Sequence, residues 1–80
     1  MKSIVIYSRK DCHLCGIMIE ELQPLIRGRL DLVVHDVDSR DDWREKYHTR
    51  VPVMEYDGEF ICQYHLDREA LARILSKHPT

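Results

Sequence analysis

The sequence predicts one α/β domain whose elements follow the order β-α-β-α-β-β-α. Three observations predict this class. Short apolar runs, typical of buried strands, alternate with segments whose apolar residues recur every three or four positions, as on one face of a helix. Asp57-Gly58 joins two apolar runs as a tight hairpin turn. A chain of 80 residues has room for one hydrophobic core, so we expect residues 1–80 to form a single domain.

The first strand and the first helix are predicted in the N-terminal third. Residues 3–7 contain a continuous apolar run and are predicted to form a buried strand. A helix is expected to begin at Cys12 and to stop at Gly28. Pro24 lies inside this helix and predicts a kink rather than an end. The residues expected on the buried helix face are Met18, Ile19, Leu22, Leu25 and Ile26.

A second buried strand is predicted at residues 32–34, continuing to Val37. Because a helix separates the two strands, they should lie parallel through a right-handed crossover. Ser39 with Asp42 three residues later resembles a capping box and predicts a short helix that ends near His48. The inner face of that helix should carry Trp43 and Tyr47.

The last third is predicted to form a hairpin and a helix. Val53–Tyr56 and Glu59–Gln63 are the two hairpin strands. Asp67 is the expected N-cap of the final helix, with Leu66 packing against Leu71 as a hydrophobic staple. The buried face of this helix should consist of Ala70, Leu71, Ile74 and Leu75.

This order of elements predicts where a site would form. If the third strand runs antiparallel to the first, its beginning lies at the sheet edge where the first strand ends. Three segments then meet at one edge: residues 8–15, 50–52 and 63–67. The carboxyl ends of strands are where open α/β sheets place their sites.

Composition and charge narrow the classes of function. The chain is 44% hydrophobic and 32% charged, as in ordinary globular proteins, and its net charge of −2 argues against a nucleic-acid or anionic-membrane surface. No targeting segment or bilayer-length apolar run is visible, so we expect a cytoplasmic protein. In a reducing compartment, three cysteines are not a disulfide framework, and a Cys-x-x-Cys pair is more often catalytic or metal-binding.

Cys12 and Cys15 are the residues expected to carry the chemistry. They lie one turn apart at the helix start, within disulfide reach. Free backbone N–H groups and the helix dipole favour a thiolate at Cys12, whereas Asp11 opposes it as a negative neighbour and as a rival N-cap. A thiolate at Cys12 would attack a disulfide, and Cys15 would resolve the mixed disulfide. The basic neighbours that favour the thiolate are Arg9, Lys10 and protonated His13.

The run from Tyr7 to Cys15, the segment Arg50-Val51-Pro52-Val53 and the Asp57-Gly58 hairpin together resemble the thioredoxin superfamily. Within it, the chain is most similar to small bacterial glutaredoxin-like proteins that carry Cys-His-Leu-Cys. The resemblance covers nearly the whole chain. It implies a thioredoxin-like fold, a four-stranded mixed sheet with helices on both faces, and a cis peptide bond before Pro52. It also implies an exposed nucleophile at Cys12 and a buried resolving thiol at Cys15.

The function implied is that of a glutaredoxin-like thiol–disulfide oxidoreductase, acting as a monomer without a bound cofactor or metal. Its expected partners are protein or small-molecule disulfides and a reductase that donates electrons, with glutathione as a candidate co-substrate. The residues expected to bind substrate are Arg9, His13, Arg50, Val51, Pro52 and Asp67.

The chain departs from the glutaredoxin pattern at three points. Arg9 stands where glutaredoxins often carry Lys, and Arg50 replaces the Thr before Val-Pro. Glutaredoxins also place a Gly-Gly pair before the last helix, which lets the backbone approach the glutamyl end of glutathione. Residues 63–66, Gln-Tyr-His-Leu, stand there in this chain. We therefore expect weaker use of glutathione than in a typical glutaredoxin.

Alternatives remain open at this point. The Cys-x-x-Cys thiols could bind zinc or be inert, although zinc usually takes four ligands and no second such pair is present. Cys12 could hold an iron–sulfur cluster across a dimer, or the chain could be a non-catalytic redox-sensing interaction domain. Cys62 is expected to pack as a small hydrophobic residue rather than take part in redox chemistry.

Overall fold

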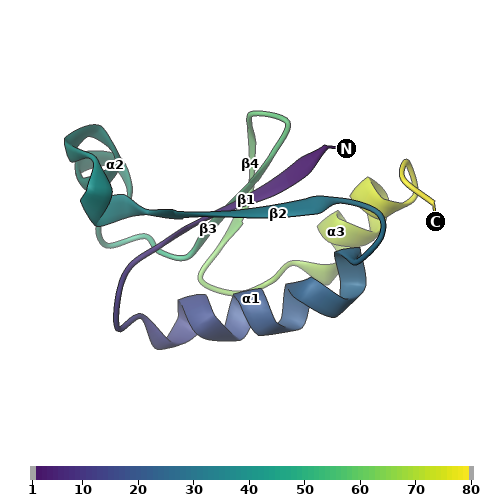
Figure 1. The fold of residues 1–80 in the computed structure, drawn as a ribbon, viewed down its shortest axis with the longest axis horizontal. Helices are drawn as coiled ribbons and strands as arrows, with labels where there is room; N and C mark the ends of the chain where they lie inside the picture. The colour runs from purple at the N-terminus through teal and green to yellow at the C-terminus, as the bar shows by residue number, and fades with distance from the viewer. Residues whose placement is uncertain (1, 80) are drawn as a thin grey trace.

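The computed structural model describes residues 2–79 and has the element order predicted from the sequence. Its elements are β1 (Ser3–Ser8), α1 (His13–Ile26), β2 (Asp31–Asp36), the 3-10 helix η1 (Val37–Ser39), α2 (Asp41–Tyr47), β3 (Val53–Tyr56), β4 (Glu59–Gln63) and α3 (Arg68–Leu75). The strands form one mixed sheet in the order β2-β1-β3-β4 (Figure 1). β1 runs parallel to β2 and antiparallel to β3, and β3 pairs antiparallel with β4.

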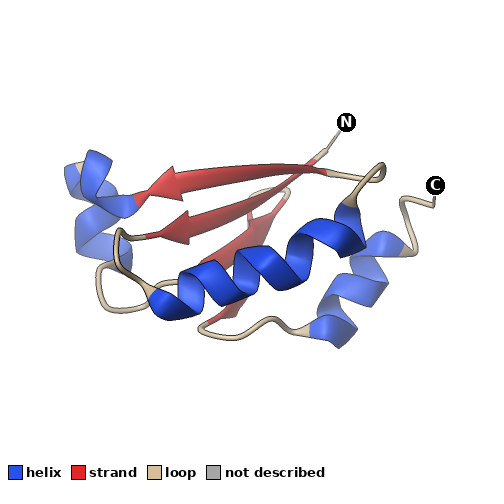
Figure 2. Cartoon of the chain, turned by 60° about the horizontal axis from the view of Figure 1, so that its bottom comes forward, coloured by secondary structure: helices blue, strands red, loops and turns tan. Residues whose placement is uncertain are grey.

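Helices cover the two faces of the sheet unequally. α1 and α3 lie together on one face (Figures 1 and 2), over the larger core, which includes Ile4 and Ile6 of β1. Neighbouring residues of a strand point to opposite faces, so Tyr7 belongs to the other face. There it packs against a smaller cluster of Val37, Tyr47 and Val53, which α2 covers near the carboxyl ends of β1 and β2. The predicted arrangement of helices on both faces is thus confirmed.

The second strand differs from its prediction. β2 lies at an edge of the sheet rather than between two strands, and Val34 is 45% exposed. The sequence run is uniformly apolar, and an edge position cannot be told from a central one by hydrophobicity alone. Val37 is fully buried, as expected, but it lies in η1 after the strand has ended.

The predicted capping box of α2 is wrong. Arg40 is the N-cap, and no side chain caps the helix. The Ser39 hydroxyl donates instead to the carbonyl of Asp36 at 2.6 Å, within the 3-10 turn. The Asp42 carboxylate accepts from Arg40 at 2.9 and 3.0 Å. Both residues of the predicted capping box thus bond to other partners, Ser39 to a backbone carbonyl and Asp42 to a guanidinium. A pattern of residue types does not show which partner each side chain will take.

The other predicted boundaries are confirmed. α1 begins directly after Cys12 and continues through Pro24. The hairpin turns at Asp57 and Gly58, both with positive φ (53° and 81°), which is the conformation this pair favours. The Asp67 carboxylate caps α3 by accepting from the backbone N–H of Ala70 at 3.0 Å. None of the helices between residues 2 and 79 combines the length and apolar character of a membrane span.

Candidate active site

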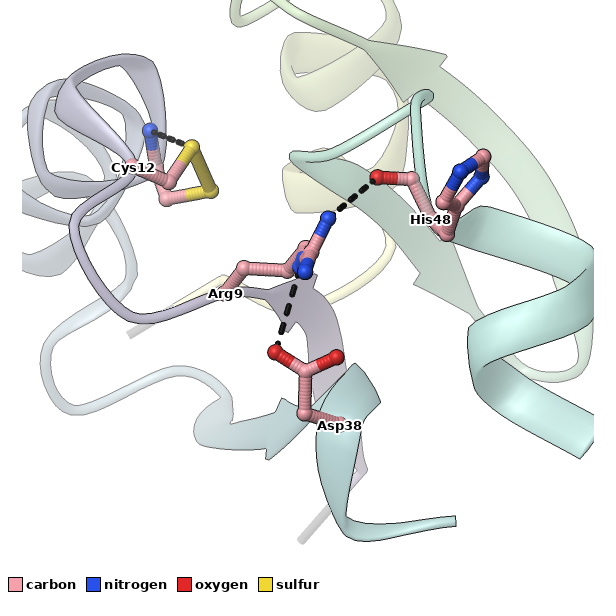
Figure 3. Close-up of a disulfide and its surroundings, with 5 residues drawn as sticks. Arg9, Cys12, Asp38 and His48 are labelled. Carbon is pink, nitrogen blue, oxygen red and sulfur yellow. Dashed lines mark hydrogen bonds and ion pairs between the residues drawn. A yellow bond between two sulfur atoms is a disulfide. The ribbon is translucent and has the colours of Figure 1, made fainter. Parts of the chain in front are cut away.

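Cys12 and Cys15 form a disulfide at the N-terminus of α1 (Figure 3). Their Cα atoms are 5.3 Å apart. Cys12 is the N-cap of the helix, and its Sγ accepts a hydrogen bond from the backbone N–H of Cys15 at 3.2 Å. Cys12 is half-buried, whereas Cys15 is only 3% exposed. The less buried of the two cysteines is therefore also the one whose sulfur the helix N-terminus can stabilise as an anion.

A tight turn delivers Cys12 to this position. The backbone N–H of Cys12 donates to the carbonyl of Arg9 at 3.3 Å, which closes a four-residue turn. Asp11, the third residue of the turn, has φ 63°, a left-handed conformation that aspartate adopts more readily than most residues other than glycine. Asp11 does not cap α1, since the sulfur of Cys12 takes that place. Of the two candidates for the N-cap, Asp11 and Cys12, it is Cys12 that holds this position.

An open groove of about 560 Å³ lies beside the disulfide. Both cysteines line it, together with Ser8, Arg9, Asp11 and the exposed His13. Gly16 and Ile19 of α1 form the apolar part of its wall. His13, one of the predicted substrate-binding residues, therefore lies beside the sulfur atoms.

The predicted convergence of three segments at one sheet edge is confirmed by hydrogen bonds. The peptide bond before Pro52 is cis, as the resemblance implied, and Pro52 is buried. Its carbonyl accepts from the backbone N–H of Tyr64 at 2.8 Å, which joins the loop before β3 to the loop after β4. Arg9 Nη1 donates to the carbonyl of His48 at 3.1 Å, which joins the turn of the cysteines to the same region (Figure 3).

The two arginines predicted to bind substrate are both engaged within the chain. Arg9 Nε donates to Asp38 Oδ2 at 3.2 Å, in addition to the bond from Nη1 to His48. Arg50 Nε donates to Gln63 Oε1 at 3.1 Å. The hydrogen bond from Arg9 is the main cause that lowers the pKa of Asp38, and Arg44 contributes to the same shift. The Asp67 carboxylate is likewise occupied as the cap of α3.

In the loop between β4 and α3, Tyr64 has a backbone conformation that the sequence did not predict. Tyr64 has φ 68°, a backbone conformation that glycine adopts without steric cost. Its hydroxyl donates to the carbonyl of Thr49 at 3.3 Å, and the side chain is 38% exposed. Tyr64 therefore takes a glycine-like backbone at the position of the missing Gly-Gly pair, but it adds a large side chain there.

Asp38 and His48 were missed as site residues because they are 29 and 39 residues from Arg9 in the sequence. Asp38 belongs to an acidic stretch, residues 36–42, whose composition alone indicates a solvated, helix-capping surface. Only the folded chain brings these acceptors to Arg9. Nothing in local spacing signals such a contact.

Cys62 does not line the groove beside the disulfide. It is 8% exposed, and it packs in the larger core among apolar side chains. Burial raises the pKa of its thiol. The expectation that it packs as a small hydrophobic residue is confirmed. Among residues 2–79, no three His, Cys, Asp or Glu side chains are grouped so that they could hold a metal ion.

Fold and site together define a thioredoxin-like domain with a Cys-x-x-Cys pair at the N-terminus of its first helix. The family model described as glutaredoxin-like domain (DUF836) matches residues 3–76 of the chain. The chain belongs to this glutaredoxin-like family of the thioredoxin superfamily. No protein with a curated description gives a significant match.

Solved structures support the same fold. Protein Ne2328 from Nitrosomonas europaea is 30% identical, with a TM-score of 0.80 over 91% of this chain and 89% of that one. The structural-genomics target XcR50 from X. campestris is 26% identical, with a TM-score of 0.70 over 95% and 99% of the two chains. The germline-specific thioredoxin Deadhead from Drosophila melanogaster, 19% identical, matches with a TM-score of 0.58 over 95% of this chain and 79% of its own. At that identity the likeness to Deadhead concerns the fold alone.

Proposed function

We propose that this protein is a thiol–disulfide oxidoreductase that uses Cys12 as nucleophile and Cys15 as resolving thiol. One observation carries the proposal: the disulfide joins half-buried Cys12, whose sulfur receives a hydrogen bond from the helix N-terminus, to buried Cys15 one turn away. Thiolates attack disulfides, and a helix N-terminus favours the thiolate. Membership of the glutaredoxin-like family agrees with this chemistry.

The proposed reaction starts from the reduced pair. The Cys12 thiolate attacks one sulfur of a substrate disulfide, forms a mixed disulfide and releases the other substrate sulfur as a thiolate that takes up a proton. Cys15 then loses its proton and attacks the Sγ of Cys12. This step forms the Cys12–Cys15 disulfide and releases the second substrate thiol. Two electrons have moved from the protein to the substrate, and a reductase or a small thiol returns them.

The groups proposed to hold the substrate surround the pair. His13 lines the groove beside the sulfurs. The backbone of Val51, which the cis bond joins to Pro52, is proposed to offer an edge on which an extended peptide can pair as an added strand. Arg50 and Asp67 lie on the segments that converge at this edge, and further contacts are proposed for them only after their internal bonds open. The proposed setting is the cytoplasm, where a reducing environment lets such a pair cycle, with the protein acting as a monomer.

Turnover of a simple disulfide tests the proposal. Purified protein is mixed with bis(2-hydroxyethyl) disulfide and either glutathione with its reductase or thioredoxin reductase, and NADPH consumption is followed. We expect turnover with at least one donor, and its loss in Cys12→Ser. The reduction potential of the pair is measured on the same sample. Absence of turnover with both donors, for a pair that the donors can reduce, would identify a non-catalytic redox-sensing domain instead.

A further inference from the structure

We propose that Arg9 is a positioning residue: its guanidinium holds the turn that delivers Cys12 against Asp38 and His48, and does not receive a substrate carboxylate. We call these three residues the Arg9 latch. The inference rests on the proposed function in one respect, namely that Cys12 is the nucleophile. It assigns Arg9 a role other than the carboxylate binding expected from its place beside the cysteines.

The geometry of the guanidinium supports this role. A carboxylate binds a guanidinium best through two parallel hydrogen bonds, either to Nε and one Nη or to both Nη atoms. Arg9 Nε is bonded to Asp38 at 3.2 Å, and Nη1 is bonded to the His48 carbonyl at 3.1 Å (Figure 3). Each of the two paired faces thus has one member already engaged. Two of the five guanidinium N–H donors are therefore engaged, and a substrate carboxylate that bound through Nε would have to displace Asp38.

Both acceptors are held in place by bonds of their own. Asp38 accepts at its other carboxylate oxygen from Arg44 Nε at 3.3 Å, and its backbone N–H donates to the Asp36 side chain at 2.9 Å. His48 directly follows Tyr47, whose hydroxyl donates to Glu55 Oε2 at 2.9 Å and whose ring stacks on Tyr7 with centroids 4.2 Å apart. The latch therefore attaches the turn to preformed structure.

The backbone of Arg9 connects this attachment to Cys12. Its carbonyl accepts from the backbone N–H of Cys12 at 3.3 Å, so Arg9 is the first residue of the turn that ends at the nucleophile. Within that turn, Asp11 is in the left-handed region, with φ 63°. A turn that requires one left-handed residue keeps its conformation when its surroundings fix it. Without the latch, we expect the turn to relax and Cys12 to spend less time as the cap of α1.

Alkylation of reduced Cys12 tests this inference without requiring disulfide turnover. The rate is measured at neutral pH with neutral iodoacetamide and with anionic iodoacetate, and the modified residue is identified by mass spectrometry. The variants are Arg9→Gln, Arg9→Lys and Asp38→Asn. Arg40→Gln is the matched control, because it removes an arginine paired with Asp42 on the surface of the protein. Slow labelling of buried Cys62 reports that each variant remains folded.

We expect all three latch variants to slow Cys12 labelling by about three- to tenfold, by the same factor for both reagents, since each loses one or two hydrogen bonds of the latch. Arg40→Gln should match the wild type. Three results would overturn the inference: wild-type rates in the latch variants, a loss confined to iodoacetate, or faster labelling in Asp38→Asn together with wild-type rates in Arg9→Lys. The last two would show that Arg9 acts through its charge. A wild-type Cys12 no more reactive than Cys62 would instead refute the proposed function.

Discussion

Cys12 and Cys62 place the same chemical group in two contrasting regions of one small domain. Cys12 is half-buried at the sheet edge where three segments converge, and its sulfur accepts a hydrogen bond from a backbone N–H of α1. Cys62 lies on β4 in the larger core, among apolar side chains, and burial raises the pKa of its thiol. Under the proposed function, this difference decides which thiol reacts: a helix N-terminus favours the thiolate anion, and an apolar core disfavours it.

The surroundings of the two thiols also differ in their polar groups. At the site edge, the guanidinium of Arg9 and the carboxylate of Asp38 pair across half-exposed surface. Within the described residues, no buried side-chain polar atom lacks a hydrogen-bond partner. Changes at the site edge should therefore alter chemistry, while changes in the core should alter stability.

The largest effect is expected from Cys12→Ser. A serine hydroxyl at this position cannot form the mixed disulfide, so turnover of a disulfide substrate should fall on the order of a thousandfold or more. The folded structure should persist, as judged by circular dichroism. The Cys15→Ser variant should still form the mixed disulfide through Cys12. Because it lacks the resolving thiol, the substrate should stay covalently attached. Equal trapping by Cys62 would erase the contrast between the two thiols.

The next effect concerns glutathione and the loop before α3. Bulky side chains at Tyr64 and His65 should keep the glutamyl end of glutathione from the N–H groups at the start of α3, one of which Asp67 already occupies. Losing one or two charge-assisted hydrogen bonds weakens binding by about ten- to a thousandfold. A variant with Tyr64→Gly and His65→Gly should therefore turn over a glutathione mixed disulfide faster than the wild type, with a lower KM.

The matched control for this loop is Tyr64→Phe, which keeps the ring and loses only the hydroxyl bond to Thr49. It should behave like the wild type if bulk is the cause. The backbone at Tyr64 has φ 68°, so glycine should fit there without strain. Efficient glutathione turnover by the wild type, unchanged in the double variant, would show that this loop does not decide glutathione use.

A smaller effect is expected in the core. Cys62→Ser places a hydroxyl among apolar side chains and should lower the free energy of unfolding by about 1–3 kcal/mol. Activity per folded molecule should not change. Chemical denaturation and disulfide turnover, measured on the same preparation, separate the two quantities. A loss of activity in Cys62→Ala, which brings no polar group, would give Cys62 a part in the chemistry and blur the comparison.

The smallest effect concerns the pH dependence of the Arg9 latch. The pKa of Asp38 is lowered below its ordinary value of 3.8, mainly by the hydrogen bond from Arg9. A group whose pKa is depressed on folding stabilises the protein above its unfolded pKa, and this stabilisation is lost as pH falls through the folded pKa. The melting temperatures of the wild type and Asp38→Asn should therefore differ slightly at neutral pH and converge below pH 3.8. A difference that stays constant well below pH 3.8 would contradict the pairing.

Local pattern predicted most of the fold, and the reasons are visible in particular residues. Asp57-Gly58 and Asp67 act within a few residues, so turn and cap chemistry located the hairpin and α3 correctly. The edge position of β2 and the cap of α2 depend on the strand order and on competing acceptors, which spacing does not encode. The same holds for the site: the sequence identified Cys12 and Cys15, while the partners of Arg9 come from residues far along the chain.

The most direct test of this account is the reactivity of all three cysteines in the reduced protein. Limited alkylation with iodoacetamide across a range of pH, read by mass spectrometry, gives a rate and a midpoint for each thiol. We predict that Cys12 is modified first, with a midpoint below that of a free thiol near pH 8.5, and that Cys15 and Cys62 react slowly throughout. Preferential labelling of Cys15 or Cys62 would contradict the assignment of Cys12 as the nucleophile.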